Sequence, residues 1–315
     1  MELEAYTKLP EKELLERIAK VKKEKNAVIL VHNYQVLEVQ QVADYLGDSL
    51  GLSRIAQKTD ADVVVFCGVD FMAESAKILS PEKIVLLPEI KATCPMANMV
   101  DPDELADAKR QHPEETVVAY VNTTARVKAL VDICCTSANA VNVIRTLGDR
   151  EILFVPDKNL AHYVGLTTGA KIRPWDGYCY VHNFFTVQDV ERVRTAHPDA
   201  VFLVHPESPP EVVARADHVM STSGMVDYVD HIRDDHEKRR GVIIGTEIGL
   251  VKQIQKNHPD IAIWPLSDFA ICGTMKMTTL PKVCWSIETG NYEITIPDDI
   301  LEKARASLEK MIAVH

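Results

Sequence analysis

Short runs of apolar and β-branched residues alternate along the chain with longer segments whose apolar positions recur with helical periodicity. This alternation is typical of strand-helix-strand crossovers, which build parallel sheets covered by helices. The pattern predicts an α/β fold with strands at residues 27–31, 62–67, 83–87, 116–121, 151–155, 200–204, 241–245 and 261–264. It also predicts helices at 11–24 and 299–312, the second opened by Pro297 with Asp298 as its cap.

The chain repeats itself three times. The ends of three predicted strands align with one another, at residues 31–34, 119–122 and 204–207. A hydroxyl residue follows His32, Tyr120 and His205 at the same interval of 17 residues, namely Ser49, Ser137 and Thr222. An acidic residue at a later strand end and then a cysteine complete each unit: Asp70 with Cys94, Asp157 with Cys179, and Glu247 with Cys272. A period of about 88 residues is too long for a solenoid repeat and suits a small three-layer domain.

We therefore expect three similar three-layer α/β/α domains with parallel sheets, arranged around a pseudo-threefold axis. Their expected bounds are 1–110, which includes an N-terminal helix and Cys94, 111–195, which includes Cys179, and 196–315, which includes Cys272 and a C-terminal helix. Ligands of parallel sheets collect beyond the carboxyl ends of the strands, and the repeated polar residues fall at such ends. The repeat thus predicts one central site to which all three units contribute.

Composition and charge narrow the function classes. The 315 residues are 46% hydrophobic and 26% charged, a balance that supports a sizeable folded core. A net charge of -11, with no run of basic residues to offset it, argues against nucleic acid as a partner. The acidic N-terminal stretch and the lack of a long apolar run indicate neither export nor membrane insertion, so we expect a cytoplasmic protein.

Three of the seven cysteines keep the repeat register, and we interpret these as metal ligands: Cys94, Cys179 and Cys272. Three thiolates would hold a 4Fe-4S cluster that normally takes four, which leaves one iron open as a Lewis acid. Zinc is the competing metal, with His182 as a fourth ligand, but the chain has no closely spaced C-x-x-C pair, so iron-sulfur is favoured. The other four cysteines break the register and are interpreted as structural: Cys67 and the Cys134-Cys135 pair in apolar strands, and Cys284.

Polar side chains at the aligned strand ends form three i, i+2 pairs, which place both members on one face of an extended segment: His32 with Tyr34, Tyr120 with Asn122, and His205 with Glu207. Imidazole, phenol and carboxylate groups can donate and accept protons. The hydroxyls of Ser49, Ser137 and Thr222 would suit carboxylates or a phosphate if each precedes a helix, where they could also act as N-caps. No phosphate-binding glycine motif is present, so nucleotide binding has no support. The pairs at His112, His197 and His258 with the prolines that follow them are expected to be loop entries to strands.

At these residues the chain resembles the quinolinate synthase family, from about residue 28 to residue 296. The likeness is carried by His32-Asn33-Tyr34-Gln35, Gly47-Asp48-Ser49-Leu50, the segments 68–74 and 94–99, Tyr120-Val121-Asn122-Thr123, the segments 136–140 and 156–160, Cys179-Tyr180-Val181-His182, His205-Pro206-Glu207 and the segment 272–276. The resemblance implies three α/β domains around a pseudo-threefold axis and a central 4Fe-4S cluster held by Cys94, Cys179 and Cys272. It further implies condensation of iminoaspartate with dihydroxyacetone phosphate to quinolinate, with release of phosphate and two waters, in de novo NAD biosynthesis.

The same resemblance implies which residues line the site: His32, Tyr34, Ser49, Tyr120, Asn122, Ser137, His182, His205, Glu207, Ser221 and Thr222. On this hypothesis Tyr34 and Glu207, assisted by His32 and His205, move protons, while the hydroxyls anchor anionic groups. A functional link to an iminoaspartate-producing aspartate oxidase or dehydrogenase is expected. Some relatives carry additional cysteines near the third ligand, whereas this chain has Cys272-Gly273-Thr274-Met275, so disulfide control is not expected here. Two rival interpretations are a zinc-dependent lyase or aldolase and a non-enzymatic iron-sulfur sensor, although no basic DNA-binding module is visible.

Overall fold

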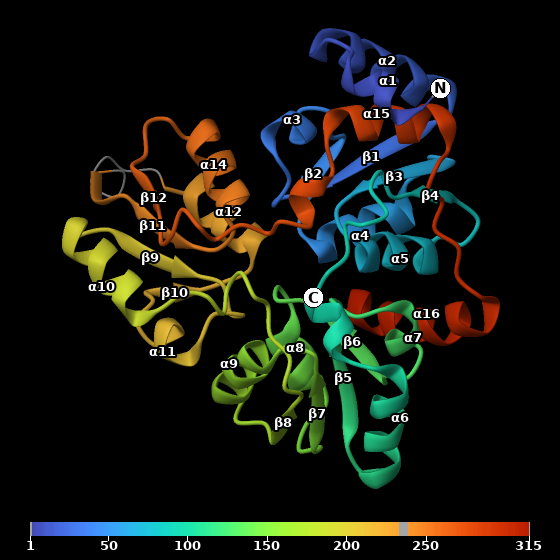
Figure 1. The fold of residues 1–315 in the computed structure, drawn as a ribbon. Coiled ribbons are helices and arrows are strands. Elements are labelled where there is room, and N and C mark those ends of the chain that lie inside the picture. Colours follow the sequence, from blue (N-terminus) through green and yellow to red (C-terminus); the bar gives the residue numbers. More distant parts are fainter. Residues whose placement is uncertain (1, 233–238, 315) are drawn as a thin grey trace.

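The fold consists of three separate parallel sheets of four strands each, seen in a computed structural model that describes residues 2–232 and 239–314. All three sheets have the same strand order, in which the first strand of each lies between the second and the third: β2-β1-β3-β4, β6-β5-β7-β8 and β10-β9-β11-β12. Figure 1 shows the sheets arranged around a common centre, each accompanied by its own helices. The predicted α/β class with three similar domains is confirmed. The terminal bounds expected at residues 1 and 315 lie outside the described residues, and the internal boundaries stay a prediction.

The first sheet contains the strands β1 (Ala27–His32), β2 (Tyr45–Gly47), β3 (Val63–Cys67) and β4 (Ile84–Leu86). Its helices are α1 (Leu3–Thr7), α2 (Glu11–Glu24), α3 (Leu37–Gln40), α4 (Ser49–Lys58) and α5 (Asp70–Leu79), with a 3-10 turn at Met96–Met99. Successive residues of β1 enter different cores, because side chains alternate across a strand. Val28 and Leu30 lie in one core, and Ile29 and Val31 in another. Burial on both faces explains why such strands are apolar without alternation.

The second and third sheets repeat this arrangement. The second has β5 (Thr116–Tyr120), β6 (Ile133–Cys135), β7 (Ile152–Val155) and β8 (Ile172–Pro174), with α6 (Pro102–Gln111), α7 (Ala125–Lys128), α8 (Ala140–Thr146) and α9 (Lys158–Thr168). The third has β9 (Val201–Val204), β10 (His218–Val219), β11 (Val242–Gly245) and β12 (Ile263–Pro265), with α10 (Val187–Ala196), α11 (Pro210–Val213), α12 (Thr222–Asp230) and α14 (Ile248–Asn257), and a 3-10 turn at Met275–Met277.

The repeat extends to hydrogen bonds that the sequence pattern did not predict. In each unit an aspartate just before the second strand accepts the backbone N–H of a residue in the first strand, at 2.9, 2.8 and 2.8 Å: Asp44 from Ile29, Asp132 from Val117, and Asp217 from Phe202. The His-Pro pairs also recur, because His112, His197 and His258 are the residues at which α6, α10 and α14 end. The expectation that these histidines lie in loops before strands is confirmed.

The last two helices leave the third sheet and join the others. The helix α15 (Leu280–Thr289) packs against α1 and α2 on the first sheet, and α16 (Asp298–Ala313) packs against α5, α7 and β6. The prediction that Asp298 caps the final helix is wrong, because Pro297 occupies the cap position and Asp298 is the first helical residue. There it supplies one of two acidic side chains in the first turn, which favours the positive end of the helix dipole. Within the described residues no helix is both long and apolar enough to cross a membrane.

Candidate active site

A cavity lies where the carboxyl ends of the strands of all three sheets meet, which is where parallel sheets place ligands. Its space between atoms, open mouth included, is about 720 Å³. The three register cysteines line this one cavity, together with most of the predicted polar residues: Cys94, Cys179, Cys272, His32, Tyr34, Ser49, Tyr120, Asn122, Ser137, His205, Glu207 and Thr222. Residues separated by up to 240 positions in sequence are therefore neighbours in space.

Each cysteine is held in the same way by the acidic residue of its own unit. The backbone N–H of Cys94 donates to Asp70 Oδ1 at 3.2 Å, that of Cys179 to Asp157 Oδ2 at 3.1 Å, and that of Cys272 to Glu247 Oε1 at 3.1 Å. The same carboxylates also accept N–H groups at the starts of helices α5, α9 and α14. In each unit the acidic residue thus joins the loop that carries the cysteine to the start of a helix. This shared contact explains why an acidic residue recurs at the same place in every repeat.

The three cysteine thiols that line the cavity are better suited to bind a metal than to act as nucleophiles. All seven cysteines are free, and burial raises the pKa of each of the three thiols that line the cavity. A thiolate in such surroundings needs positive charge beside it, which a bound metal supplies. The remaining cysteines lie in the apolar cores, as predicted: Cys67, Cys134, Cys135 and Cys284. The donor set at the cavity therefore fits a cluster with three protein ligands.

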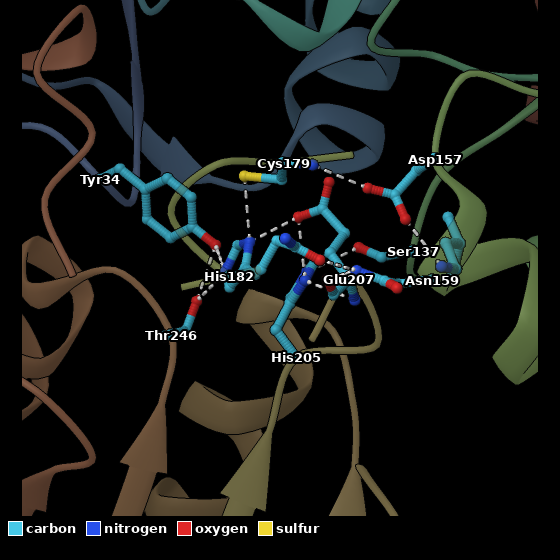
Figure 2. A network of polar contacts seen from close by, with 11 residues as sticks. Tyr34, Ser137, Asp157, Asn159, Cys179, His182, His205, Glu207 and Thr246 are labelled. Atoms are coloured by element: carbon cyan, nitrogen blue, oxygen red, sulfur yellow. Dashed lines mark hydrogen bonds and ion pairs between the residues drawn. The ribbon is translucent and has the colours of Figure 1, made fainter. Parts of the chain in front are cut away.

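Glu207 is the centre of a buried polar network, drawn in Figure 2. Its Oε2 lies 2.8 Å from His182 Nδ1 and 3.0 Å from His205 Nδ1, so two imidazoles can donate to one carboxylate oxygen. Burial alone would raise the pKa of Glu207, but the two histidines outweigh it and hold that pKa below its usual value. Burial and the neighbouring His182 lower the pKa of His205, which indicates a neutral ring beside an ionised carboxylate.

The other oxygen of this carboxylate, Oε1, is buried and has no hydrogen-bond partner among the described residues. The same is true of Asn122 Oδ1, and both residues line the cavity. Buried polar atoms are rarely left unpaired in folded proteins, because each costs about 1–3 kcal/mol. Two such acceptors in one cavity indicate where a ligand with N–H or O–H groups would bind.

Tyr34 reaches the same network from the first sheet. Its phenol oxygen lies 2.8 Å from Thr246 Oγ1 and 3.3 Å from His182 Nε2, and those two atoms are 2.9 Å apart. Thr246 Oγ1 therefore lies within hydrogen-bonding distance of both the phenol of Tyr34 and the His182 ring, and it joins the first unit to the Glu207 network. Burial, with Glu207 as a second cause, raises the pKa of Tyr34 well above its usual value, so the phenol keeps its proton.

His32 is a neutral hydrogen-bond donor in this site. Burial, followed by the charges of Lys276 and His205, lowers the pKa of His32 to about 3. Its Nδ1 accepts the backbone N–H of Tyr34 at 3.2 Å, so the single ring proton is on Nε2. His205 has the equivalent backbone contact, because the N–H of Glu207 lies 3.4 Å from its Nδ1, but this Nδ1 also lies 3.0 Å from Glu207 Oε2, and its Nε2 lies 3.2 Å from Ser137 Oγ. The carboxylate beside Nδ1 therefore distinguishes His205 from His32.

Two of the three hydroxyls lie at helix N-termini without capping them. Ser49 and Thr222 are the first residues of α4 and α12, whereas the preceding residues, Asp48 and Ser221, accept the N–H groups of Gly51 and Gly224. The hydroxyl of Thr222 instead accepts Asn33 Nδ2 at 3.1 Å. Ser137 lies in the turn that precedes α8. Each hydroxyl lines the cavity, and two of them lie beside free N–H groups that favour anions.

Comparison with known proteins shows to which family the chain belongs. A model of the quinolinate synthetase A protein family matches residues 16–313, nearly the whole chain. The chain belongs to the quinolinate synthase family. The quinolinate synthase of Methanoregula boonei is 50% identical over 301 residues, which cover 96% of this chain and 98% of that protein. Those of Pyrococcus furiosus and of Dehalococcoides mccartyi strain CBDB1 are also 50% identical, over 302 and 298 residues, and each alignment covers 95% of this chain and 97% of the relative. The resemblance drawn from the motifs is confirmed.

Two residues that the likeness to quinolinate synthases places in the site lie behind the cavity wall. His182 is fully buried, with its Nδ1 3.3 Å from Cys179 Sγ, and Ser221 caps α12. The structure also brings in residues that the sequence reasoning missed: Asn33, Asn159, Thr246 and Lys276. For Thr246 a signal was present, because the repeat register aligns it with Val69 and Pro156, which have no hydroxyl. Cys179, His182 and Glu207 also form a group whose ligand atoms all lie within 4.8 Å of one another.

Proposed function

We propose that this protein is an enzyme that condenses iminoaspartate with dihydroxyacetone phosphate to quinolinate, releasing phosphate and two waters, as a step of de novo NAD biosynthesis. Membership of the quinolinate synthase family supports this function. The observation that carries it is the convergence of Cys94, Cys179 and Cys272 on one cavity that also contains the Glu207 network.

The cofactor that we propose is one 4Fe-4S cluster held by Cys94, Cys179 and Cys272. The fit rests on three buried, free thiols, each fixed through its backbone N–H by a carboxylate. When bound, such a cluster leaves one iron without a protein ligand and supplies a Lewis acid that polarises a substrate oxygen. Zinc, held by the same three cysteines with His182 as a fourth ligand, is the competing metal. A zinc ion held instead by Cys179, His182 and Glu207 would leave two of the three cavity cysteines without a role. Metal analysis distinguishes the two.

Substrate anions would be held by the hydroxyls of Ser49, Ser137 and Thr222. The N-termini of α4 and α12 add N–H groups and a favourable dipole at two of these positions. The Nε2–H of His32 and the amide of Asn122 would give further hydrogen bonds to the substrates, since both residues line the same cavity. Iminoaspartate carries two carboxylates and dihydroxyacetone phosphate carries one phosphate, which makes three anionic groups. The three hydroxyls, one from each unit, match this number.

Glu207 and Tyr34 are the residues that we expect to move protons. The ionised carboxylate of Glu207, oriented by His182 and His205 through Oε2, presents its unpaired Oε1 as a base toward bound substrate. The phenol of Tyr34 remains protonated and can donate to a substrate atom in the cavity that it lines. His32 and His205 assist by holding their neighbours in place through Nδ1.

The setting that we propose is the cytoplasm, with iminoaspartate supplied by an aspartate oxidase or dehydrogenase. Anaerobic incubation of the purified protein with both substrates tests the function, with quinolinate detected by mass spectrometry. We expect product from the wild type and from Cys284→Ala, whose thiol is buried in the first-sheet core, but not from Cys94→Ser. Equal product from both variants, or none from an iron-loaded wild type, would contradict the proposal.

A further inference from the structure

Tyr34 is held at both ends by the third unit, although it belongs to the first. Its phenol oxygen lies 2.8 Å from Thr246 Oγ1, in the turn between β11 and α14. Its main-chain carbonyl accepts a hydrogen bond from Lys276 Nζ, in the segment that follows Cys272. A tyrosine fixed at its hydroxyl and at its backbone has little freedom to move the phenol relative to the cavity.

Lys276 is itself fixed by a buried carboxylate. Its Nζ lies 2.9 Å from Glu247 Oε1 and 3.0 Å from Oε2, and the Glu247 side chain is fully buried. Glu247 also accepts the N–H of Cys272, so the carboxylate, the lysine and the carbonyl of Tyr34 form a continuous chain of hydrogen bonds. A charged donor held by a buried charge has a well-defined position, because leaving it would strand the carboxylate.

The first and third units approach each other closely at Gly249, beside the contact between Lys276 and Tyr34. A Cβ placed on Gly249, in the first turn of α14, would lie 2.5 Å from Lys276 Nζ and 2.8 Å from the carbonyl oxygen of Tyr34. The absence of a side chain there allows the first and third units to approach each other. The equivalent boundary elsewhere shows the same device, since Asn159 Nδ2 from α9 donates to the carbonyl of Glu207 at 2.9 Å.

We infer that Thr246 and the Glu247–Lys276 pair are positioning residues for Tyr34. These residues of the third unit hold the phenol of Tyr34, which belongs to the first unit, at a fixed position in the cavity. This inference rests on the proposed function in giving Tyr34 a role in proton transfer. The simpler alternative is that Lys276 only neutralises Glu247 and stabilises the Cys272 loop. The two differ in what the loss of Lys276 does to the segment around Tyr34.

The test compares Lys276→Met with Lys22→Met in anaerobically purified protein. Lys22 is a matched control, because its Nζ lies 2.6 Å from Asp44 in a partly buried pair away from the cavity. We expect the iron content of Lys276→Met to stay at the wild-type level while kcat falls about 10- to 100-fold with little change in KM, since a misplaced reacting group costs rate more than binding. Hydrogen exchange of the peptide covering residues 32–36 should become several-fold faster, and Lys22→Met should match the wild type in every measurement.

Thr246 provides an independent variant pair if Lys276→Met does not fold. Thr246→Val removes the hydroxyl at nearly constant volume and should lower kcat about 10-fold or more, whereas Thr246→Ser should stay within about 2-fold of wild type. Loss of iron from Lys276→Met with unchanged exchange at 32–36 would overturn the proposal in favour of the Cys272 loop. Wild-type kcat in Thr246→Val would overturn it as well. The hydrogen-exchange measurement does not need turnover, so it tests whether Lys276 holds the segment around Tyr34 even if the wild type forms no quinolinate.

Discussion

Replacing Glu207 by glutamine is the sharpest single change at the centre of the polar network. The substitution keeps the size of the side chain and removes its charge, while Oε2 currently accepts from His182 at 2.8 Å and from His205 at 3.0 Å. A glutamine would turn its oxygen to the two imidazoles and its NH₂ group to the cavity. The base that Oε1 offers would then be replaced by a donor.

The cost to stability can be worked out from these two contacts. Hydrogen bonds to a charged acceptor contribute about 1.5–3 kcal/mol each and those between neutral groups about 0.5–1.5, so the exchange loses about 1 kcal/mol per bond. Relief from burying a charge offsets part of this loss of about 2 kcal/mol, so the free energy of unfolding should fall by less than that. The variant should therefore fold and keep its iron.

The rate should respond far more strongly than the stability. A positioned general base contributes about 10²- to 10⁴-fold, so kcat of Glu207→Gln should fall by that factor in an anaerobic quinolinate assay. Glu211→Gln, an exposed position on α11 four residues away, is the control and should match the wild type. A kcat for Glu207→Gln within about 5-fold of wild type would refute the assignment of Glu207 as the base.

Three further predictions concern neighbouring groups. The pKa of His32 is lowered to about 3, so between pH 6.5 and pH 3 the unfolded chain binds a proton at this residue that the folded chain does not. The folded protein therefore loses stability as the pH falls through that window. In anaerobic urea unfolding, the free energy of unfolding of His32→Asn should fall by about 2 kcal/mol less than that of the wild type between pH 7.5 and pH 5. Gly249→Ala should lower the free energy of unfolding by about 1–3 kcal/mol, because the added Cβ would lie 2.8 Å from the backbone oxygen of Tyr34. Gly165→Ala in α9 is the control and should be neutral or stabilising in the same denaturation assay, because its Cβ would have no neighbour closer than 3.7 Å. Equal effects of the two substitutions would contradict the close contact at Gly249. Asp157→Asn should lower iron per chain, since it weakens the bond to the N–H of Cys179, while the exposed Asp176→Asn should not.

The long apolar strands and the triplicated register were predictable from the sequence because burial on both faces imposes a strong pattern. All eight predicted strands are present, and the Cys134-Cys135 strand is β6. The edge strands β2, β8 and β10 were missed, because Tyr45–Gly47, Ile172–Pro174 and His218–Val219 contain no buried residue. The strands β4, β6 and β12 are also only three residues long, but each contains at least one buried apolar residue that the sequence pattern shows.

The convergence of the cysteines was predictable from the repeat, whereas the contacts between units were not. Lys276 donates to a carbonyl 242 positions away, and nothing in its local sequence marks it as different from a surface lysine. Asn159 is likewise defined by its contact with Glu207 in the next unit. Side chains whose role is to join units depend on how the units pack, and that packing has no periodic signature in the chain.

Mössbauer spectroscopy of anaerobic, iron-57-labelled protein tests most directly whether the three units share one open metal centre. We expect four iron atoms per chain, one of which changes its signal on addition of a substrate dicarboxylate, and loss of the whole spectrum in the variant that combines Cys94→Ser, Cys179→Ser and Cys272→Ser. An iron-free protein carrying zinc, or an iron spectrum that survives removal of all three cysteines, would contradict this account.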